Sequence, residues 1–112
     1  MGLKEYLFGF KSENVAAKYL LSQGFEILEK NFHSKFGEID IIAKKDDILH
    51  FIEVKSTSKD YETIYRVTQN KIYKIIKTIN FYMLKYDFDL NYQIDIICIE
   101  QDKVKFVQNV SF

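Results

Sequence analysis

Asp40, Glu53 and Lys55 are the residues whose types and spacing most clearly predict chemistry in this chain. Asp40 and Glu53 lie in two neighbouring β-branched stretches, and Lys55 follows Glu53 by two residues. Two carboxylates held about 5 Å apart can chelate one hard divalent cation through oxygen. A nearby ammonium can orient or help to deprotonate a metal-bound water, and it stabilises negative charge that develops on a phosphate. The three residues therefore suit the hydrolysis of a phosphodiester bond.

A β-hairpin is predicted to bring these residues together. Its strands are the β-branched runs 37–43 and 48–55, and a short polar stretch separates them. A two-residue turn at positions 46–47 sets the register and places Asp40 opposite Glu53.

The same register places Glu38 opposite Lys55, on the face that carries Asp40 and Glu53, because side chains alternate along a strand. Opposed carboxylates destabilise a sheet; Lys55 offsets part of this repulsion, and a metal ion would offset more. The alternative is a solvent-facing hairpin whose charges form ordinary cross-strand ion pairs. Apolar residues adjoin the charged ones: Ile39, Ile41, Phe51, Ile52 and Val54. They favour core strands, in which charges cost more, and so weaken that alternative.

The elements on either side complete an α/β domain. A helix is expected over residues 3–23, and Gly24 is placed to end it in a left-handed conformation. A second helix follows an N-cap at Thr68 and carries one apolar stripe: Ile72, Ile75, Ile76, Ile79 and Met83. Three further strands are predicted: 25–32, 93–99 and 103–107. The predicted order is α-β-β-β-α-β-β, and the crossover around the second helix favours parallel pairing in a mixed sheet flanked by helices.

Size and composition limit the classes of function. With 112 residues and 13.4 kDa, the chain forms one domain over residues 1–112. Sixteen Lys and Arg balance sixteen Asp and Glu, so no overall basic field attracts nucleic acid. Cys98 is the only cysteine, which excludes a disulfide framework and a thiolate-rich zinc site and favours a reducing, cytoplasmic setting. We expect no membrane partner, because charged residues interrupt every apolar run.

Local charge partly compensates for the neutral total. The stretch 66–85 contains no acid and five basic residues: Arg66, Lys71, Lys74, Lys77 and Lys85. One helix face could track the phosphates of a nucleic acid, or the lysines could simply solubilise the polar side of a core helix. Aromatic residues of this region could stack on bases, or they could complete a core or a subunit interface: Tyr65, Tyr73, Phe81 and Tyr82.

Glu13 is a further acid of interest on the first predicted helix. Its neighbours at helical spacing are apolar: Phe10, Ala16, Ala17 and Leu20. A carboxylate in such surroundings could be a fourth acid over the metal. The alternative is an early-helix acid favoured by the helix dipole, or a border residue that reaches solvent.

Two motifs resemble the bacterial YraN family: Gly37-Glu38-Ile39-Asp40-Ile41-Ile42-Ala43 and Phe51-Ile52-Glu53-Val54-Lys55. That family is similar to archaeal Holliday-junction resolvases, within the PD-(D/E)XK, restriction-endonuclease-like nucleases. Further matching positions extend over nearly the whole chain: Glu13-x-x-Ala16-Ala17-x-Tyr19-Leu20, Gly24, Asn31-Phe32, Val67, Lys71, Asp95-Ile96-Ile97 and Asn109-Val110-Ser111-Phe112. The resemblance implies a restriction-endonuclease-like fold, and the element order predicted from periodicity agrees with it.

Each motif position carries an implied role. By resemblance, Asp40 and Glu53 are metal ligands with the backbone carbonyl beside Val54 as a third, and Lys55 is the catalytic lysine. Glu13 corresponds to a helix acid that assists metal binding, and Glu38 belongs to a Gly-Glu-x-Asp signature. A Gln-x-x-x-Tyr element found in some of these nucleases is matched by Gln69 and Tyr73. Two family arginines are replaced here, by Thr57 and Gln93.

We therefore expect a cytoplasmic endonuclease that uses one or two Mg²⁺ or Mn²⁺ ions to cut DNA, including branched or recombination and repair DNA. Residues expected to contact the nucleic acid are Glu38, Arg66, Gln69, Lys71 and Lys74. Analogy with resolvases adds a homodimer with two active sites for two strands. Two alternatives stay open: a catalytically weak nucleic-acid-binding module of the same fold in a DNA-processing complex, and a protein-interaction domain that binds neither metal nor DNA.

Overall fold

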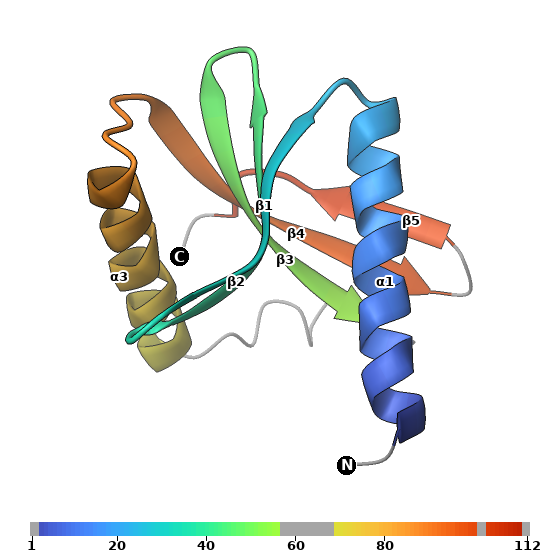
Figure 1. The fold of residues 1–112 in the computed structure, drawn as a ribbon. Helices are drawn as coiled ribbons and strands as arrows, with labels where there is room; N and C mark the ends of the chain where they lie inside the picture. The colour runs from blue at the N-terminus through green and yellow to red at the C-terminus, as the bar shows by residue number, and fades with distance from the viewer. Residues whose placement is uncertain (1–2, 57–68, 101–102, 111–112) are drawn as a thin grey trace.

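The chain forms two helices and five strands in a computed structural model that describes residues 3–56, 69–100 and 103–110, with side chains from Ser12 in the first helix and from Ile72 in the second (Figure 1). The elements are α1 (Leu3–Ser22), β1 (Glu26–Ser34), β2 (Gly37–Lys45), β3 (Ile48–Ser56), α3 (Gln69–Lys85), β4 (Asn91–Glu100) and β5 (Lys103–Val107). The strand bounds depart from the predicted ones by at most two residues.

The five strands form one mixed sheet in the order β1-β2-β3-β4-β5. β3 and β4 are parallel and α3 lies between them in the chain, whereas the other neighbouring pairs are antiparallel. This arrangement confirms the predicted mixed sheet flanked by helices and the predicted parallel pairing. Positions 57–68 lie outside the described residues, so the element order predicted across them stays a prediction, as do the proposed roles of Arg66 and Thr68.

The hairpin turn follows from its two aspartates. Asp46 and Asp47 both have positive φ, 52° and 61°, as a two-residue type I′ turn requires, and aspartate tolerates this conformation better than most residues. The turn sets the predicted register, from Lys45 opposite Ile48 to Ile41 opposite Ile52. This part of the hairpin is therefore specified locally.

Gly24 ends α1 as predicted. Its φ of +88° lies in the left-handed region, and its N–H donates to the Leu21 carbonyl at 3.2 Å. The Phe25 N–H donates to the Leu20 carbonyl at 3.0 Å, which completes a Schellman motif. The motif turns the chain into β1 and places Phe25 under α1.

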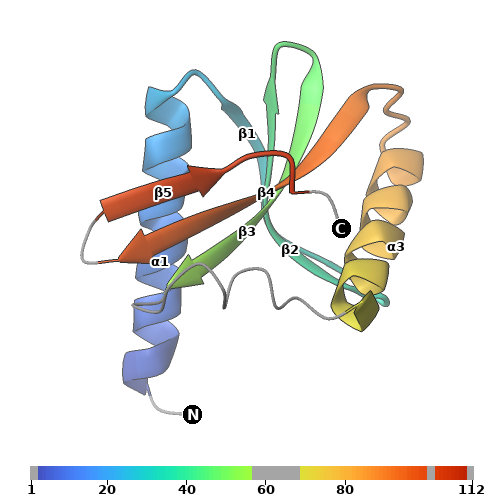
Figure 2. The same cartoon turned by 180° about the vertical axis from the view of Figure 1, so that it is seen from behind.

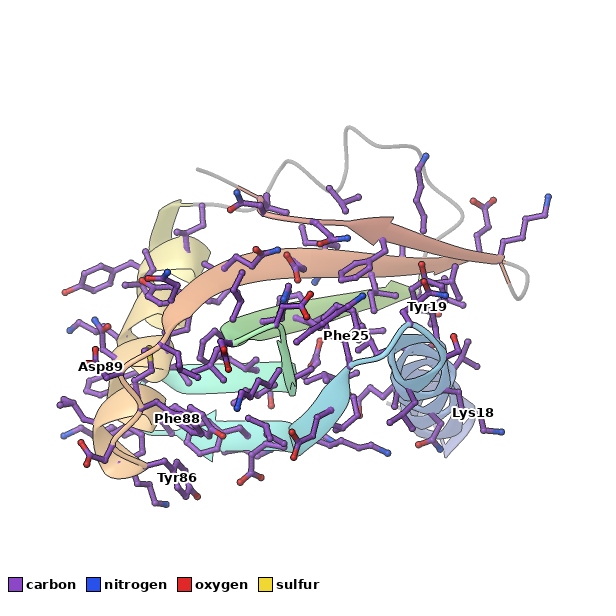
Figure 3. The ribbon with its side chains drawn as sticks, turned by 90° about the horizontal axis from the view of Figure 1, so that it is seen from above. Lys18, Tyr19, Phe25, Tyr86, Phe88 and Asp89 are labelled. Atoms are coloured by element: carbon purple, nitrogen blue, oxygen red, sulfur yellow. The ribbon has the colours of Figure 1, made fainter. Side chains whose placement is uncertain are left out.

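The two helices cover opposite faces of the sheet. In β2, Ile41 and Ala43 pack in the core cluster of α1, while the intervening Ile42 packs in the cluster of α3. Figure 3 shows Tyr19 and Phe25 on the α1 side and Phe88 on the α3 side. The predicted apolar stripe of α3 is confirmed at Ile75 and Ile79, which are buried, and at Met83, which packs against the same core cluster. Ile76 is 38% exposed, because its side chain points away from the sheet. Within the described residues, no helix combines the length and apolarity needed to cross a membrane.

The sheet divides where the candidate site lies. Pairing between β2 and β3 ends at Ile41 and Ile52; beyond that point β2 stays with β1, and β3 stays with β4. Asn31 of β1 lies between the pairs Lys30–Ile41 and Phe32–Ile39, beside Asp40, and has a φ of 54°. Ile39 packs under α3 although Ile41 packs under α1, so β2 changes face at Asp40. Figures 1 and 2 show the first part of β2 diverging from the end of β3 toward α3.

Candidate active site

A pocket of about 370 Å³ lies where β2 and β3 part. Residues from β2, β3 and α3 line it: Gly37, Glu38, Asp40, Glu53, Val54, Lys55, Lys74 and Ile75. The structure thus brings the predicted acids and lysine together in one cavity, with Glu38 and Lys74 beside them. Their roles in chemistry stay predictions.

Asp40 bridges the two strands with its side chain. Its Oδ2 accepts a hydrogen bond of 2.8 Å from the Val54 N–H, and its carboxyl group hydrogen-bonds with the side chain of Glu53. The predicted continuation of the hairpin pairing is corrected here: Glu38 pairs with His33 of β1 rather than with Lys55. The reason is the change of face at Asp40, which carries the start of β2 away from β3.

Burial and charge both act on the two acids. Burial is the largest cause that raises the pKa of Asp40, and the negative charge of Glu38 raises it further. The hydrogen bond from the Val54 N–H, the positive charge of Lys55 and the hydrogen bond with the Glu53 side chain lower it. The Oε1 atom of Glu53 is completely buried. The site therefore holds carboxylates in a position where the negative charge is disfavoured, and a bound cation would relieve this cost.

Glu13 faces the same region from α1. Burial raises its pKa, a hydrogen bond with the side chain of Asn31 opposes this, and the charges of Asp40 and Glu38 raise it further. Glu13 is therefore within electrostatic reach of the pocket, although it does not line it. Asn31 is a residue to which the sequence assigned no role. The signal was an asparagine inside a predicted strand, since asparagine is enriched at positive φ.

α3 approaches β2 closely at Gly37. A Cβ at Gly37 would lie 3.4 Å from Thr78 Oγ1 and 3.6 Å from Lys74 Cβ, which are ordinary van der Waals distances. Thr78 Oγ1 donates to the Lys74 carbonyl at 2.8 Å and lies 3.2 Å from Ser34 Oγ, within hydrogen-bonding distance. These contacts hold Lys74 over the pocket.

The donor set around Asp40 fits a hard divalent cation. Asp40 and Glu53 supply carboxylate oxygens, the ligands that Mg²⁺ and Mn²⁺ prefer. The Val54 N–H points toward β2, and in an extended strand the carbonyl of the same residue points to the same edge. Among the described residues, no group of three or more His, Cys, Asp or Glu side chains is arranged to hold a metal ion. Glu13 as a direct ligand stays a prediction.

His50 and Cys98 both have structural surroundings. His50 and the fully buried Asp95 are joined by a hydrogen bond of 2.6 Å on the α1 side, where the ring of His50 packs edge-on against Phe25. The second oxygen of Asp95 accepts hydrogen bonds of 2.8 Å from Gln93 Nε2 and from the Asn109 N–H. The sequence did not predict this buried pair, whose members are 45 positions apart. Cys98 is buried, and burial raises the pKa of its thiol.

The predicted nucleic-acid contacts are only partly described. Glu38 and Lys74 line the pocket. Gln69 and Lys71 lie in the first turn of α3, but their side chains fall outside the described residues, and Arg66 is outside them altogether.

Comparison with known proteins places these residues in a family context. The family model of the uncharacterised protein family UPF0102 matches residues 12–99, which contain all of the pocket residues. A UPF0102 protein of Campylobacter fetus subsp. fetus is 94% identical over 112 residues and covers 100% of each chain. One of Campylobacter hominis is 63% identical over 111 residues, 99% of each chain, and one of Campylobacter jejuni subsp. jejuni is 59% identical over 112 residues, 100% of each chain.

Proposed function

The chain belongs to the uncharacterised protein family UPF0102, and for this member we propose a metal-dependent endonuclease activity that hydrolyses phosphodiester bonds of DNA. Family membership bears out the resemblance to the YraN proteins; a restriction-endonuclease-like fold and a relation to Holliday-junction resolvases are part of the proposal. The observation that carries the proposal is the meeting of Asp40, Glu53 and Lys55 in one pocket at the division of the sheet.

Asp40, Glu53 and the Val54 carbonyl would hold one Mg²⁺ or Mn²⁺ ion, and the pocket volume leaves room for a phosphate beside it. Such an ion supplies a Lewis acid for the phosphate and lowers the pKa of a bound water. The Val54 N–H orients the Asp40 carboxylate, because it donates to Oδ2. Glu13 and Glu38 add negative potential around these ligands.

The lysines act on the substrate side. Lys55 lies in the pocket and is close enough to Asp40 to lower the pKa of its carboxyl group. Its ammonium would orient the attacking water and stabilise the charge that develops on the scissile phosphate. Lys74 lines the pocket from α3, where it would hold a phosphate of the substrate backbone. A cytoplasmic setting, a homodimer and branched DNA substrates complete the proposal.

The test is the cleavage of end-labelled four-way junction, flap, duplex and single-stranded DNA in Mn²⁺ and in Mg²⁺. The wild type is compared with Lys55→Ala and with Lys18→Ala, an exposed lysine that points away from the sheet (Figure 3). We expect Lys55→Ala to lose at least about 100-fold in rate, as for other groups that stabilise transition-state charge, and Lys18→Ala to cut like the wild type. Equal activity of Lys55→Ala and wild type would assign the cleavage to a contaminant or another site. Binding without cleavage by the wild type would favour the alternative of a nucleic-acid-binding module.

A further inference from the structure

Lysine and aromatic side chains form a cluster beside the pocket, on the outer side of α3 and the turn between β1 and β2. Lys77 Nζ lies 4.6 Å from the ring centroid of Tyr73 and 5.2 Å from that of Phe36, so one ammonium joins both rings. Lys35 Nζ lies 5.2 Å from the centroid of Phe36. Tyr73 is 58% exposed and Lys35 is exposed. We call these four residues, Lys35, Phe36, Tyr73 and Lys77, the aromatic platform.

The platform is continuous with the pocket through the chain itself. Phe36 precedes Gly37 and Tyr73 precedes Lys74, and both Gly37 and Lys74 line the pocket. Tyr73 and Lys77 are four positions apart on α3, which places them on one face of the helix. A strand whose phosphate lies in the pocket therefore reaches the platform within its next nucleotides.

The charge of this surface suits a polyanion. α3 contains four lysines and no acid, although the whole chain is neutral. Among the described residues, Lys35, Lys74 and Lys77 form no ion pair with a carboxylate. The positive charge of this face is therefore available to phosphates, and it is concentrated next to the proposed active site.

The platform rings differ from two exposed rings further along the chain, Phe81 in α3 and Tyr86 directly after it. Phe81 and Tyr86 also lie near a lysine, Lys85, but they contact buried core rings: Phe81 contacts Phe32 and Tyr86 contacts Tyr82. Figure 3 shows Tyr86 at the end of α3 with Phe88 and Asp89. Those contacts give Phe81 and Tyr86 a packing role; among the side chains that the structure describes, the more exposed Tyr73 has no such contact with a core ring.

From this juxtaposition we propose that the aromatic platform binds unpaired nucleotides of a single nucleic-acid strand next to the pocket. Tyr73 and Phe36 stack on bases, and Lys35, Lys74 and Lys77 contact the phosphates between them. Stacking requires free base faces, which a duplex interior does not offer, so the substrate carries a single-stranded segment beside the scissile phosphate. This inference rests on the proposed function and narrows its substrate class.

The first experiment measures binding, without cleavage, by fluorescence anisotropy of a labelled oligothymidylate of about 20 nucleotides in EDTA. Tyr73→Ala is compared with Tyr86→Ala; Tyr86 is an exposed tyrosine that directly follows α3 and lies beside Lys85. We expect Tyr73→Ala to weaken binding about 10-fold, Tyr86→Ala to change it less than about 2-fold, and Tyr73→Phe to bind like the wild type, because stacking needs the ring and not the hydroxyl. Circular dichroism checks that each variant is folded.

The second measurement is the salt dependence of the same binding. Loss of one phosphate contact in Lys77→Met should reduce the slope of log Kd against log salt by about 0.7, the value for a single strand. Oligouridylate should bind with similar affinity, whereas a blunt duplex should bind more weakly. Equal weakening by Tyr73→Ala and Tyr86→Ala, no weakening by Tyr73→Ala, or a preference for the duplex would overturn the platform.

The two proposals fail separately. Lys18→Ala should bind oligothymidylate like the wild type, because Lys18 is an exposed residue of α1 outside both the pocket and the platform. If the wild type cleaves DNA and Tyr73→Ala binds and cleaves it equally well, the proposal of the aromatic platform is refuted and the proposed nuclease activity is supported. If binding depends on Tyr73 but the wild type does not cleave DNA, the proposed nuclease activity is refuted and the proposal of the aromatic platform is supported.

Discussion

Replacement of Asp40 by asparagine separates the two effects of this carboxylate, its hydrogen bond and its charge. The amide has nearly the same shape, and its oxygen can still accept the 2.8 Å bond from the Val54 N–H. The bridge between β2 and β3 is therefore kept, while the charge that burial disfavours is removed. Without metal, we expect Asp40→Asn to be at least as stable as the wild type at pH 7.

Metal should reverse this order. A ligand present at about 100 times its Kd stabilises the folded state by about 2.7 kcal/mol, which corresponds to an increase in Tm of roughly 10–20 °C for a domain of about this size. We expect Mn²⁺ to raise the Tm of the wild type by an amount of this order. In Asp40→Asn, one of the two carboxylate ligands is lost, so the increase should be smaller by more than half.

The assay is thermal unfolding followed by circular dichroism, in EDTA and at increasing Mn²⁺ and Mg²⁺. Asp89→Asn is the matched control, because Asp89 is an exposed acid on the α3 side of the molecule (Figure 3). Its metal-dependent increase should equal that of the wild type. An increase of the same size in Asp40→Asn would refute the metal site, and a large loss of stability of this variant in EDTA would refute the account of the buried charge.

Three further predictions follow from other parts of the structure. Burial raises the pKa of Asp40 and of Glu13 above their ordinary values of 3.8 and 4.5. In EDTA, their contribution to stability is therefore fully present below those ordinary values and is lost as the pH rises through the raised values. Urea titrations should show that the stability of the wild type relative to Asp40→Asn falls as the pH rises from 4 to 8. His50→Ala leaves the Asp95 carboxylate buried without its 2.6 Å partner and should cost about 3–5 kcal/mol in urea unfolding, whereas the exposed His33→Ala should stay within about 0.5 kcal/mol of the wild type. Asp47→Gly should raise the unfolding free energy by about 0.5–1 kcal/mol, because glycine takes the φ of 61° without steric cost; a destabilised variant would contradict the turn geometry.

The elements and the hairpin register could be predicted because short-range chemistry specifies them. The turn at Asp46 and Asp47 pairs the strands by itself, and Gly24 ends α1 through its own backbone. Alternating burial then orients Ile41, Ile42 and Ala43. Since each of these features depends on residues close in sequence, pattern and spacing were enough.

The candidate site was predicted in its residues but not in its geometry. Asp40, Glu53 and Lys55 were identified from their types and spacing. The predicted backbone pairing of Asp40 with Glu53 is replaced by hydrogen bonds of the Asp40 side chain with the Val54 N–H and with the Glu53 side chain. The change came from the positive φ of Asn31 and the change of face at Asp40. A uniform alternation of side chains cannot represent such an irregularity.

What the sequence determined by itself is therefore the set of elements, the turn that joins β2 to β3, and the identity of the acids and the lysine that line the pocket. The tertiary structure alone decided that the sheet divides beyond Ile41 and Ile52, that Lys74 lies over the resulting pocket, and that His50 meets Asp95. These features join residues far apart in the chain. They depend on how α3 packs against β2 and on the register between the parallel strands β3 and β4, which no local spacing specifies.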